Sequence, residues 1–268
     1  MSSSIETSHT STLRPQRTIG ISLKLYFTLT QTTTYLTSIF PLVSLAEKYN
    51  IHLFIVPSLL SLSSASLLLT KTIPRPSISL GAQDCFWEDS GPYTGEVSPS
   101  ELAELNCELV ELGHAERRRL FHETDADVAK KALAVIRNGM IPLICIGEET
   151  HGSVEEAVSK CKPQIESILS LPLKPNQQLI FAYEPIWAIG QPNPASAKYV
   201  VDVVKGLRSI CSSRSLGNEI RFLYGGSAGP GTFEEMREGV DGLFLGRFAH
   251  DVRNLRKIIE EVASASPS

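Results

Sequence analysis

The 268-residue sequence lacks the features that mark several large classes of protein. It has no run of about 18 apolar residues, the length that spans a bilayer, and serines interrupt its longest apolar stretch, 59–69. Its five cysteines form no Cys-x-x-Cys pair, so we expect neither a metal site nor a disulfide framework. The net charge of −4 gives no electrostatic basis for binding nucleic acid. We therefore expect a soluble cytoplasmic protein without a membrane or nucleic-acid partner.

The composition is that of an ordinary globular protein, with 42% hydrophobic and 20% charged residues. A chain of this mass buries roughly 73% of its unfolded surface, which permits one large core. We expect a single domain over 18–263. Residues 1–17 are Ser/Thr-rich without an apolar region, which predicts a disordered tail and leaves a mitochondrial presequence as the alternative. A second disordered tail is expected over 264–268.

Short apolar runs recur along the chain at regular intervals. Continuous runs of this kind suit strands that are buried on both faces, as in a parallel sheet covered by helices. The eight predicted strands are Thr18–Leu25, Ile51–Pro57, Ser77–Gln83, Glu108–Leu112, Ile141–Ile146, Gln178–Tyr183, Glu219–Tyr224 and Asp241–Leu245.

Segments of helical periodicity separate these runs. Helices are predicted over 124–137, 153–169, 196–210 and 252–262. The segment Thr28–Asn50 is rich in threonine and contains Pro41, so we expect a broken or late-starting helix there.

This alternation predicts an α/β fold, a single (β/α)8 barrel, which needs eight such units in about 250 residues. The alternative is a doubly wound open sheet. That fold usually carries a Gly-x-Gly-x-x-Gly motif after its first strand, and the segment Ile19–Phe27 has one glycine. We therefore favour the barrel.

Ionisable residues and glycines follow several predicted strands, at the end where barrels of this class place their active sites. They are Lys24, His114, Glu116, Glu184, Gly225–Ser227 and Gly246–Arg247. Glycine turns place backbone N–H groups around an anion and a lysine adds positive charge, which indicates a phosphate ester. A carboxylate beside a neutral imidazole suits proton removal next to a carbonyl. Ketose–aldose phosphate isomerisation needs these groups and no cofactor or metal.

Several longer motifs, in the same order, resemble the triosephosphate isomerase family between Thr18 and Val262. Leu112–Arg118 (LGHAERR) resembles its histidine segment, and Ala182–Gly190 (AYEPIWAIG) its glutamate and the start of its lid. The remaining matches are Tyr224–Ser227 and Gly242–Gly246, similar to its phosphate-binding turns, and Tyr93–Ser98, similar to the loop that enters the neighbouring subunit of family dimers.

The resemblance implies a role for each matching residue. Glu184 would be the general base and His114 a neutral electrophile, as known for this family. Lys24 would stabilise developing charge, and Glu116 would organise the site through Lys24. The residues implied to bind substrate or its phosphate are Ser22, Gly190, Gly226, Ser227, Gly246 and Arg247. Thr94, in the loop, implies a homodimer, and the lid is expected to close over a small phosphorylated sugar.

Three departures from the family pattern leave the substrate open. Ser22 replaces an asparagine, which leaves space near the substrate, and Arg247 replaces a glycine, where it contacts phosphate or points into the closing helix. The lid, Gln191–Ser196, contains two prolines. These features resemble the branch acting on four-carbon erythrulose phosphates, so three- and four-carbon substrates both remain. The segment Leu25–Phe27 fits neither branch and raises the alternative of a catalytically silent phosphate-binding scaffold. The presence of Glu184, His114 and Lys24 together argues against that alternative.

Overall fold

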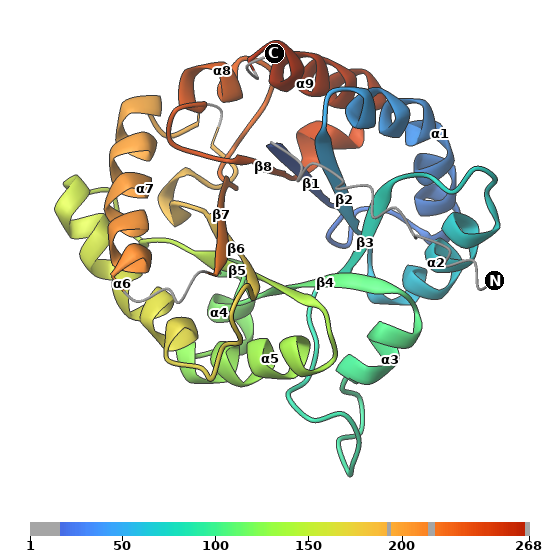
Figure 1. Ribbon diagram of the computed structural model, residues 1–268, viewed down its shortest axis with the longest axis horizontal. Coiled ribbons are helices and arrows are strands. Elements are labelled where there is room, and N and C mark those ends of the chain that lie inside the picture. Colours follow the sequence, from blue (N-terminus) through green and yellow to red (C-terminus); the bar gives the residue numbers. More distant parts are fainter. Residues whose placement is uncertain (1–16, 192–193, 214–217, 266–268) are drawn as a thin grey trace, which may run out of the picture.

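The structure is a computed structural model that describes residues 17–191, 194–213 and 218–265. Within these residues, eight parallel strands close into a barrel in sequence order, surrounded by helices (Figure 1). Because the first strand pairs with both the second and the eighth, the open-sheet alternative is excluded and the predicted (β/α)8 barrel is confirmed. The strands are β1 (Arg17–Ser22), β2 (Ile51–Val56), β3 (Ile78–Ala82), β4 (Cys107–Leu112), β5 (Ile141–Ile146), β6 (Gln178–Tyr183), β7 (Glu219–Tyr224) and β8 (Gly242–Leu245).

The helices follow the strands around the outside of the barrel. The α-helices are α1 (Leu29–Lys48), α2 (Leu62–Lys71), α3 (Pro99–Glu104), α4 (Ala115–Phe121), α5 (Asp125–Arg137), α6 (Val154–Leu169), α7 (Ala197–Ser212), α8 (Thr232–Met236) and α9 (Val252–Ser264). Short 3-10 turns are η1 (Leu59–Ser61), η2 (Ile186–Ala188) and η3 (Arg247–His250). In the described part of the chain, no helix combines the length and apolar character that crossing a membrane requires.

On β2 and on β4 to β8, side chains alternate between a core inside the barrel and a larger core beneath the helices. On β4, Leu109 belongs to the inner core, so Glu111 two residues later points inward as well. On β1, a Cβ added at Gly20 would lie 2.0 Å from the inner-core ring of Phe54, so Ser22 also points inward. Glu111 and Ser22 are thus the inward-facing residues nearest the carboxyl ends of their strands. They form part of the floor of any site at that end of the barrel.

Helix α1 corrects the prediction of a broken or late-starting helix. It runs unbroken through Pro41, beginning after Thr28, which forms a capping box with Gln31. Burial of the apolar face of α1 against the outside of the barrel outweighs the cost of roughly 3 kcal/mol for a proline inside a helix. Three threonines donate hydrogen bonds to carbonyls four residues earlier and so fit the helix: Thr32, Thr33 and Thr37.

The predicted boundaries differ from the observed ones at both ends of the barrel. Strand β1 stops at Ser22 instead of Leu25, because the chain turns at Lys24, whose φ is 45°. Arg17 begins β1 and Ser264 ends α9, so both belong to the barrel and not to the predicted tails. The rest of the predicted tail 1–17, and residues 266–268 of the other, lie outside the described residues.

One connection departs from the ring of helices. The chain between β3 and α3, which contains Thr94, projects away from the body of the barrel (Figure 1). Thr94 itself is exposed. A polar segment held out in this way has surface available for a second molecule.

Candidate active site

A cavity of about 910 Å³ opens at the carboxyl ends of the strands. It gathers all the predicted catalytic and substrate-binding residues, while Thr94 lies outside its lining. Those lining residues are Ser22, Lys24, His114, Glu116, Glu184, Gly190, Gly226, Ser227, Gly246 and Arg247. Residues from the carboxyl ends of five different strands, β1, β4, β6, β7 and β8, thus meet at the place that the fold predicts.

His114 caps the N-terminus of α4, and this fixes its ring. Its Nδ1 accepts a hydrogen bond of 3.1 Å from the backbone N–H of Glu116, which places the single proton of the neutral ring on Nε2. That Nε2 lies 3.5 Å from Glu184 Oε2 and 3.3 Å from Lys24 Nζ. Burial, helped by the charge of Lys24, lowers the pKa of His114 to about 4. The imidazole is therefore neutral at physiological pH and presents an N–H to the cavity.

Glu184 follows β6 and is 4% exposed. Its backbone N–H bonds to the carbonyl of Ile146 at 2.8 Å, while its side-chain Oε2 has no hydrogen-bond partner among the described residues. Burial, with added repulsion from Glu111 whenever that carboxyl is ionised, raises the pKa of Glu184 to about 8. A buried carboxylate oxygen without a donor binds a proton strongly, which is what a general base requires.

Gly225 is the residue that makes room for this carboxylate. A Cβ at Gly225 would lie 2.6 Å from Glu184 Cγ, closer than two carbon atoms can approach. The turn after β7 therefore packs directly against the side chain of Glu184, and only glycine fits there.

Lys24 and Glu116 form an ion pair of 2.8 Å at the mouth of the site. Burial opposes the charged form of Lys24, but the hydrogen bond and charge of Glu116 outweigh it and raise its pKa above the usual value. Glu116 therefore keeps Lys24 protonated, so that the ammonium group stays positively charged beside His114 and Glu184.

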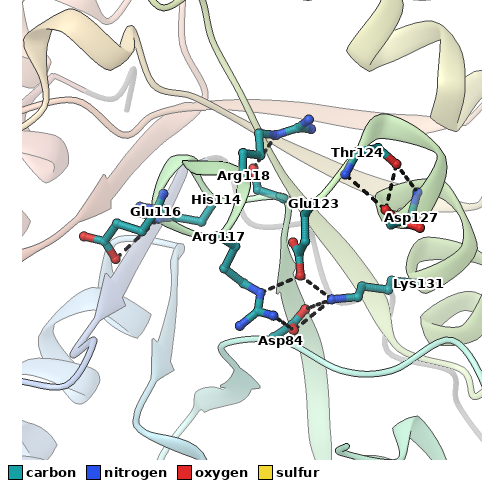
Figure 2. A network of polar contacts seen from close by, with 10 residues as sticks. Asp84, His114, Glu116, Arg117, Arg118, Glu123, Thr124, Asp127 and Lys131 are labelled. Atoms are coloured by element: carbon teal, nitrogen blue, oxygen red, sulfur yellow. Dashed lines mark hydrogen bonds and ion pairs between the residues drawn. The ribbon is translucent and has the colours of Figure 1, made fainter. Parts of the chain in front are cut away.

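A network of buried charges holds α4 against α5 (Figure 2). Arg117 bonds Glu123 at 2.6 Å and Asp84 at 2.9 Å, and Lys131 from α5 contacts the same two carboxylates. Arg118 donates to the carbonyl of Gly113, the residue before His114. Because His114 is the N-cap of α4, these contacts set the orientation of the imidazole.

Both described ends of the predicted lid are anchored to the barrel. Trp187 Nε1 donates to Glu148 at 2.8 Å, and that carboxylate also accepts from the hydroxyls of Tyr183 and Tyr199. At the other end, Ala195 N–H donates to the hydroxyl of Tyr224 at 3.0 Å. Pro192 and Asn193, in the predicted lid, lie outside the described residues.

The glycine turns after β7 and β8 form the wall opposite the loop of His114. Ser227 Oγ donates to Ala188 O at 3.1 Å, which ties the β7 turn to the base of the lid. Gly246 has open space around it and precedes Arg247, whose guanidinium lies 5.8 Å from the centre of the Tyr26 ring. Arg247 therefore lines the cavity with a positive charge.

One acidic residue of this cavity was not predicted from the sequence. Glu111, on β4, lines the floor, and its Oε2 accepts a hydrogen bond of 3.3 Å from Ser22 Oγ. The sequence does contain a signal, a glutamate inside an apolar strand two residues after an inward-facing leucine. Its partner is 89 residues away, so the pairing itself becomes visible only in the folded chain.

These observations define a class, a barrel with a buried carboxyl group, a neutral imidazole and a cavity wall of glycine turns with one arginine. The family model for triosephosphate isomerase matches residues 17–262. The chain is 40% identical over 254 residues to an L-erythrulose-1-phosphate isomerase of Pectobacterium atrosepticum, covering 93% of this chain and 96% of the relative. It is 40% identical over 218 residues to an L-erythrulose-1-phosphate isomerase of Rhizobium etli, covering 79% of this chain and 80% of the relative. It is 36% identical over 253 residues to triosephosphate isomerase 2 of Listeria innocua, covering 91% of this chain and 96% of the relative.

The chain therefore belongs to the triosephosphate isomerase family and is a phosphosugar isomerase of that type. The family and the enzyme class expected from the sequence motifs are confirmed.

Proposed function

We propose that this protein isomerises a small sugar phosphate by moving a proton between neighbouring carbons through an enediolate. One observation carries the proposal. Glu184 Oε2, buried and without a hydrogen-bond partner among the described residues, lies 3.5 Å from the Nε2 of a neutral His114. The two groups needed to remove a proton and to stabilise the resulting oxygen charge thus face one cavity.

In the proposed mechanism, the ionised form of Glu184, which its pKa of about 8 makes the minor form at neutral pH, takes a proton from the carbon next to the carbonyl. The electron pair of the broken C–H bond forms the C=C bond of the enediolate, and the carbonyl oxygen takes the negative charge. The Nε2–H of His114 donates a hydrogen bond to that oxygen, and the Lys24 ammonium, 3.3 Å from Nε2, adds positive charge. The proton of the neighbouring hydroxyl then passes to the former carbonyl oxygen. Glu184 returns its own proton to the former carbonyl carbon, and the C=O bond forms at the carbon that had lost the proton.

The phosphate is proposed to bind at the wall formed by the turns after β6, β7 and β8. Backbone N–H groups of Gly190, Gly226, Ser227 and Gly246 supply donors there, and Arg247 adds a charge-assisted contact. Glu116 acts through its 2.8 Å ion pair with Lys24, and so positions that ammonium without touching the substrate.

We propose a four-carbon erythrulose phosphate as the preferred substrate. Two relatives at 40% identity are named L-erythrulose-1-phosphate isomerase, which supports this choice. The small Ser22 side chain on the floor of the cavity leaves room for a larger ligand. The three-carbon triose phosphates are the second candidate, supported by the Listeria innocua relative at 36% identity.

The proposal extends to a homodimer in the cytoplasm. The projecting segment with the exposed Thr94 supports a contact with a second copy. All five cysteines are free thiols and buried, as expected for a protein of a reducing compartment.

The test is proton transfer by the wild-type protein and by Glu184→Gln. Each is incubated in D2O with L-erythrulose 1-phosphate or dihydroxyacetone phosphate, and NMR follows product formation and deuterium uptake at the carbon next to the carbonyl. Because the amide of Glu184→Gln cannot accept the proton, kcat should fall by roughly 10²–10⁴-fold.

Glu149→Gln, at an exposed glutamate outside the cavity lining, is the matched control and should keep wild-type turnover. Equal turnover by wild type and Glu184→Gln would contradict the mechanism, and no turnover with retained binding of a phosphorylated enediolate mimic would favour the silent scaffold.

A further inference from the structure

We propose that Glu111, together with Ser22, binds the terminal hydroxymethyl group that a four-carbon sugar phosphate has and a three-carbon one lacks. Glu111 is thereby a specificity-determining residue of this active site. The inference rests on the proposed isomerase function and adds to it the contact by which the enzyme distinguishes its two candidate substrates.

The position of Glu111 places its carboxyl group on the floor of the cavity. It stands on the inward face of β4, in line with the inner-core residue Leu109, and both Glu111 and Ser22 line the cavity. Their exposed fractions are 4% and 3%, so each is reached only from inside the site. A ligand in the cavity is therefore what can contact these two side chains.

The hydrogen bonding of Glu111 is incomplete without a ligand. Among the described residues, Ser22 supplies the one hydrogen bond to this carboxyl, at Oε2, and Oε1 has none. The neighbouring cation does not compensate, because Lys24 is paired with Glu116 at 2.8 Å. A carboxyl group buried with so few partners costs folding free energy, and nothing in the packing of an apolar strand requires it. A polar ligand group bonded to Oε1 accounts for its presence.

The chemistry of the candidate substrates places their difference at this point. L-erythrulose 1-phosphate is dihydroxyacetone phosphate with one more CH2OH group, attached to the carbon farthest from the phosphate. If the phosphate lies on the turns after β7 and β8, and the reacting carbons lie between Glu184 and His114, the extra group extends away from the phosphate wall. Strand β4 lies across the barrel from β8 (Figure 1), and its inward carboxyl is Glu111.

The protonation state of Glu111 suits a hydroxyl group. Burial raises its pKa to about 8, against the charge of Lys24 and the hydrogen bond from Ser22. At neutral pH the carboxyl is mostly protonated, so it can donate a hydrogen bond to the hydroxyl as well as accept one. A neutral acid also adds no negative charge beside the anionic phosphate ester.

The experiment compares kcat/KM for L-erythrulose 1-phosphate and dihydroxyacetone phosphate in wild type, Glu111→Leu and Glu111→Gln. Leucine removes both oxygens at similar size, and the ratio of four-carbon to three-carbon kcat/KM should fall roughly 10- to 100-fold. Glutamine keeps a donor and an acceptor and should hold the ratio within about threefold of wild type.

Glu108→Leu is the matched control, because Glu108 is on the same strand but accepts a hydrogen bond from Ser79 and lies outside the cavity lining. It should leave the ratio unchanged.

A merely structural role predicts a different result, an equal loss for both substrates, and that outcome would overturn the inference. If Glu111→Leu does not fold, Ser22→Asn fills the same space and should also lower the ratio. An unchanged ratio there would overturn the inference equally. Wild type that converts only the three-carbon substrate contradicts hydroxymethyl recognition and leaves the isomerase function standing. Wild type that converts neither contradicts the proposed function itself.

Discussion

At the scale of single residues, the site depends on carboxyl groups that the fold keeps away from water. Burial is the main cause of the raised pKa of both Glu184 and Glu111, each to about 8. A free carboxyl group in an unfolded chain titrates near about 4.3. Between these two values the folded protein holds more protons than the unfolded one, so its stability falls as pH rises through this range.

Glu111→Gln tests this linkage. Below about pH 4 both the carboxyl and the amide are neutral, so variant and wild type should unfold at similar urea concentrations. As pH rises from about 4.5 to 8, wild type loses stability that the variant keeps, by a few kcal/mol, since one pKa unit corresponds to about 1.4 kcal/mol. Urea unfolding at fixed protein concentration across pH 4–8.5 measures the difference. A difference that does not change with pH would contradict the burial of an ionisable group.

Sequence reasoning reached some of these residues and not others for a physical reason. Glu184 and His114 stand in long local motifs at strand ends, where chain order alone predicts a common site. The role of Glu111 depends on its contact with Ser22, which lies on another strand. The apolar run around Glu111 predicts only an ordinary buried strand. Pairings between distant strands are set by the closed barrel and not by local sequence.

At the scale of elements, the orientation of His114 depends on how α4 is held to α5. Lys131 is 4% exposed and contacts Asp84 and Glu123, which would otherwise be a pair of buried negative charges relieved by Arg117 alone. Lys131→Met should therefore destabilise the protein by roughly 3 kcal/mol, because it leaves carboxylates short of a partner.

Lys130→Met is the matched control for that change. Lys130 is the preceding residue on the same helix, its side chain is 57% exposed, and its contact with Asp127 is 3.9 Å long. Its loss should alter stability by no more than about 0.5 kcal/mol. Thermal unfolding of both variants gives the comparison, and equal shifts in Tm would contradict a special role for the buried lysine.

Helix α1 marks the limit of local reasoning about elements. Threonine and proline lower helix propensity, and a prediction from propensity alone breaks the helix at Pro41. Propensity amounts to a few kcal/mol over such a segment, and burial of the inner face decides the outcome instead. Helices α5 and α6 were predictable because capping, acidic first turns and apolar periodicity all agree there.

At the scale of the whole molecule, the proposed dimer is the property to test. Sedimentation equilibrium of wild type should give twice the chain mass, and Thr94→Arg should shift the protein toward monomer with a loss of turnover of tenfold or more, because a charge is buried in the contact. Ser209→Arg, on an exposed position of α7, should change neither mass nor turnover. A fully active wild-type monomer would contradict the proposal.

The fold of the whole chain was predictable because strand-like and helix-like segments alternate along its entire length. Alternating apolar runs and helical segments point to a parallel sheet, but closure depends on β1 meeting β8 at the far end of the chain. No local pattern encodes that contact. The motifs at the strand ends made the barrel the better prediction, and the pairing of Thr18 with Gly242 completes it.

The tight contact of Gly225 with Glu184 has a consequence for how this enzyme can change. A mutant library that randomises the rim of the barrel should return glycine alone at position 225, since any other residue displaces Glu184. Position 246 differs, because an added Cβ there meets no atom within 4 Å. Substitutions that alter the substrate range can therefore accumulate on the β8 side of the cavity mouth, while the residues around Glu184 tolerate no change.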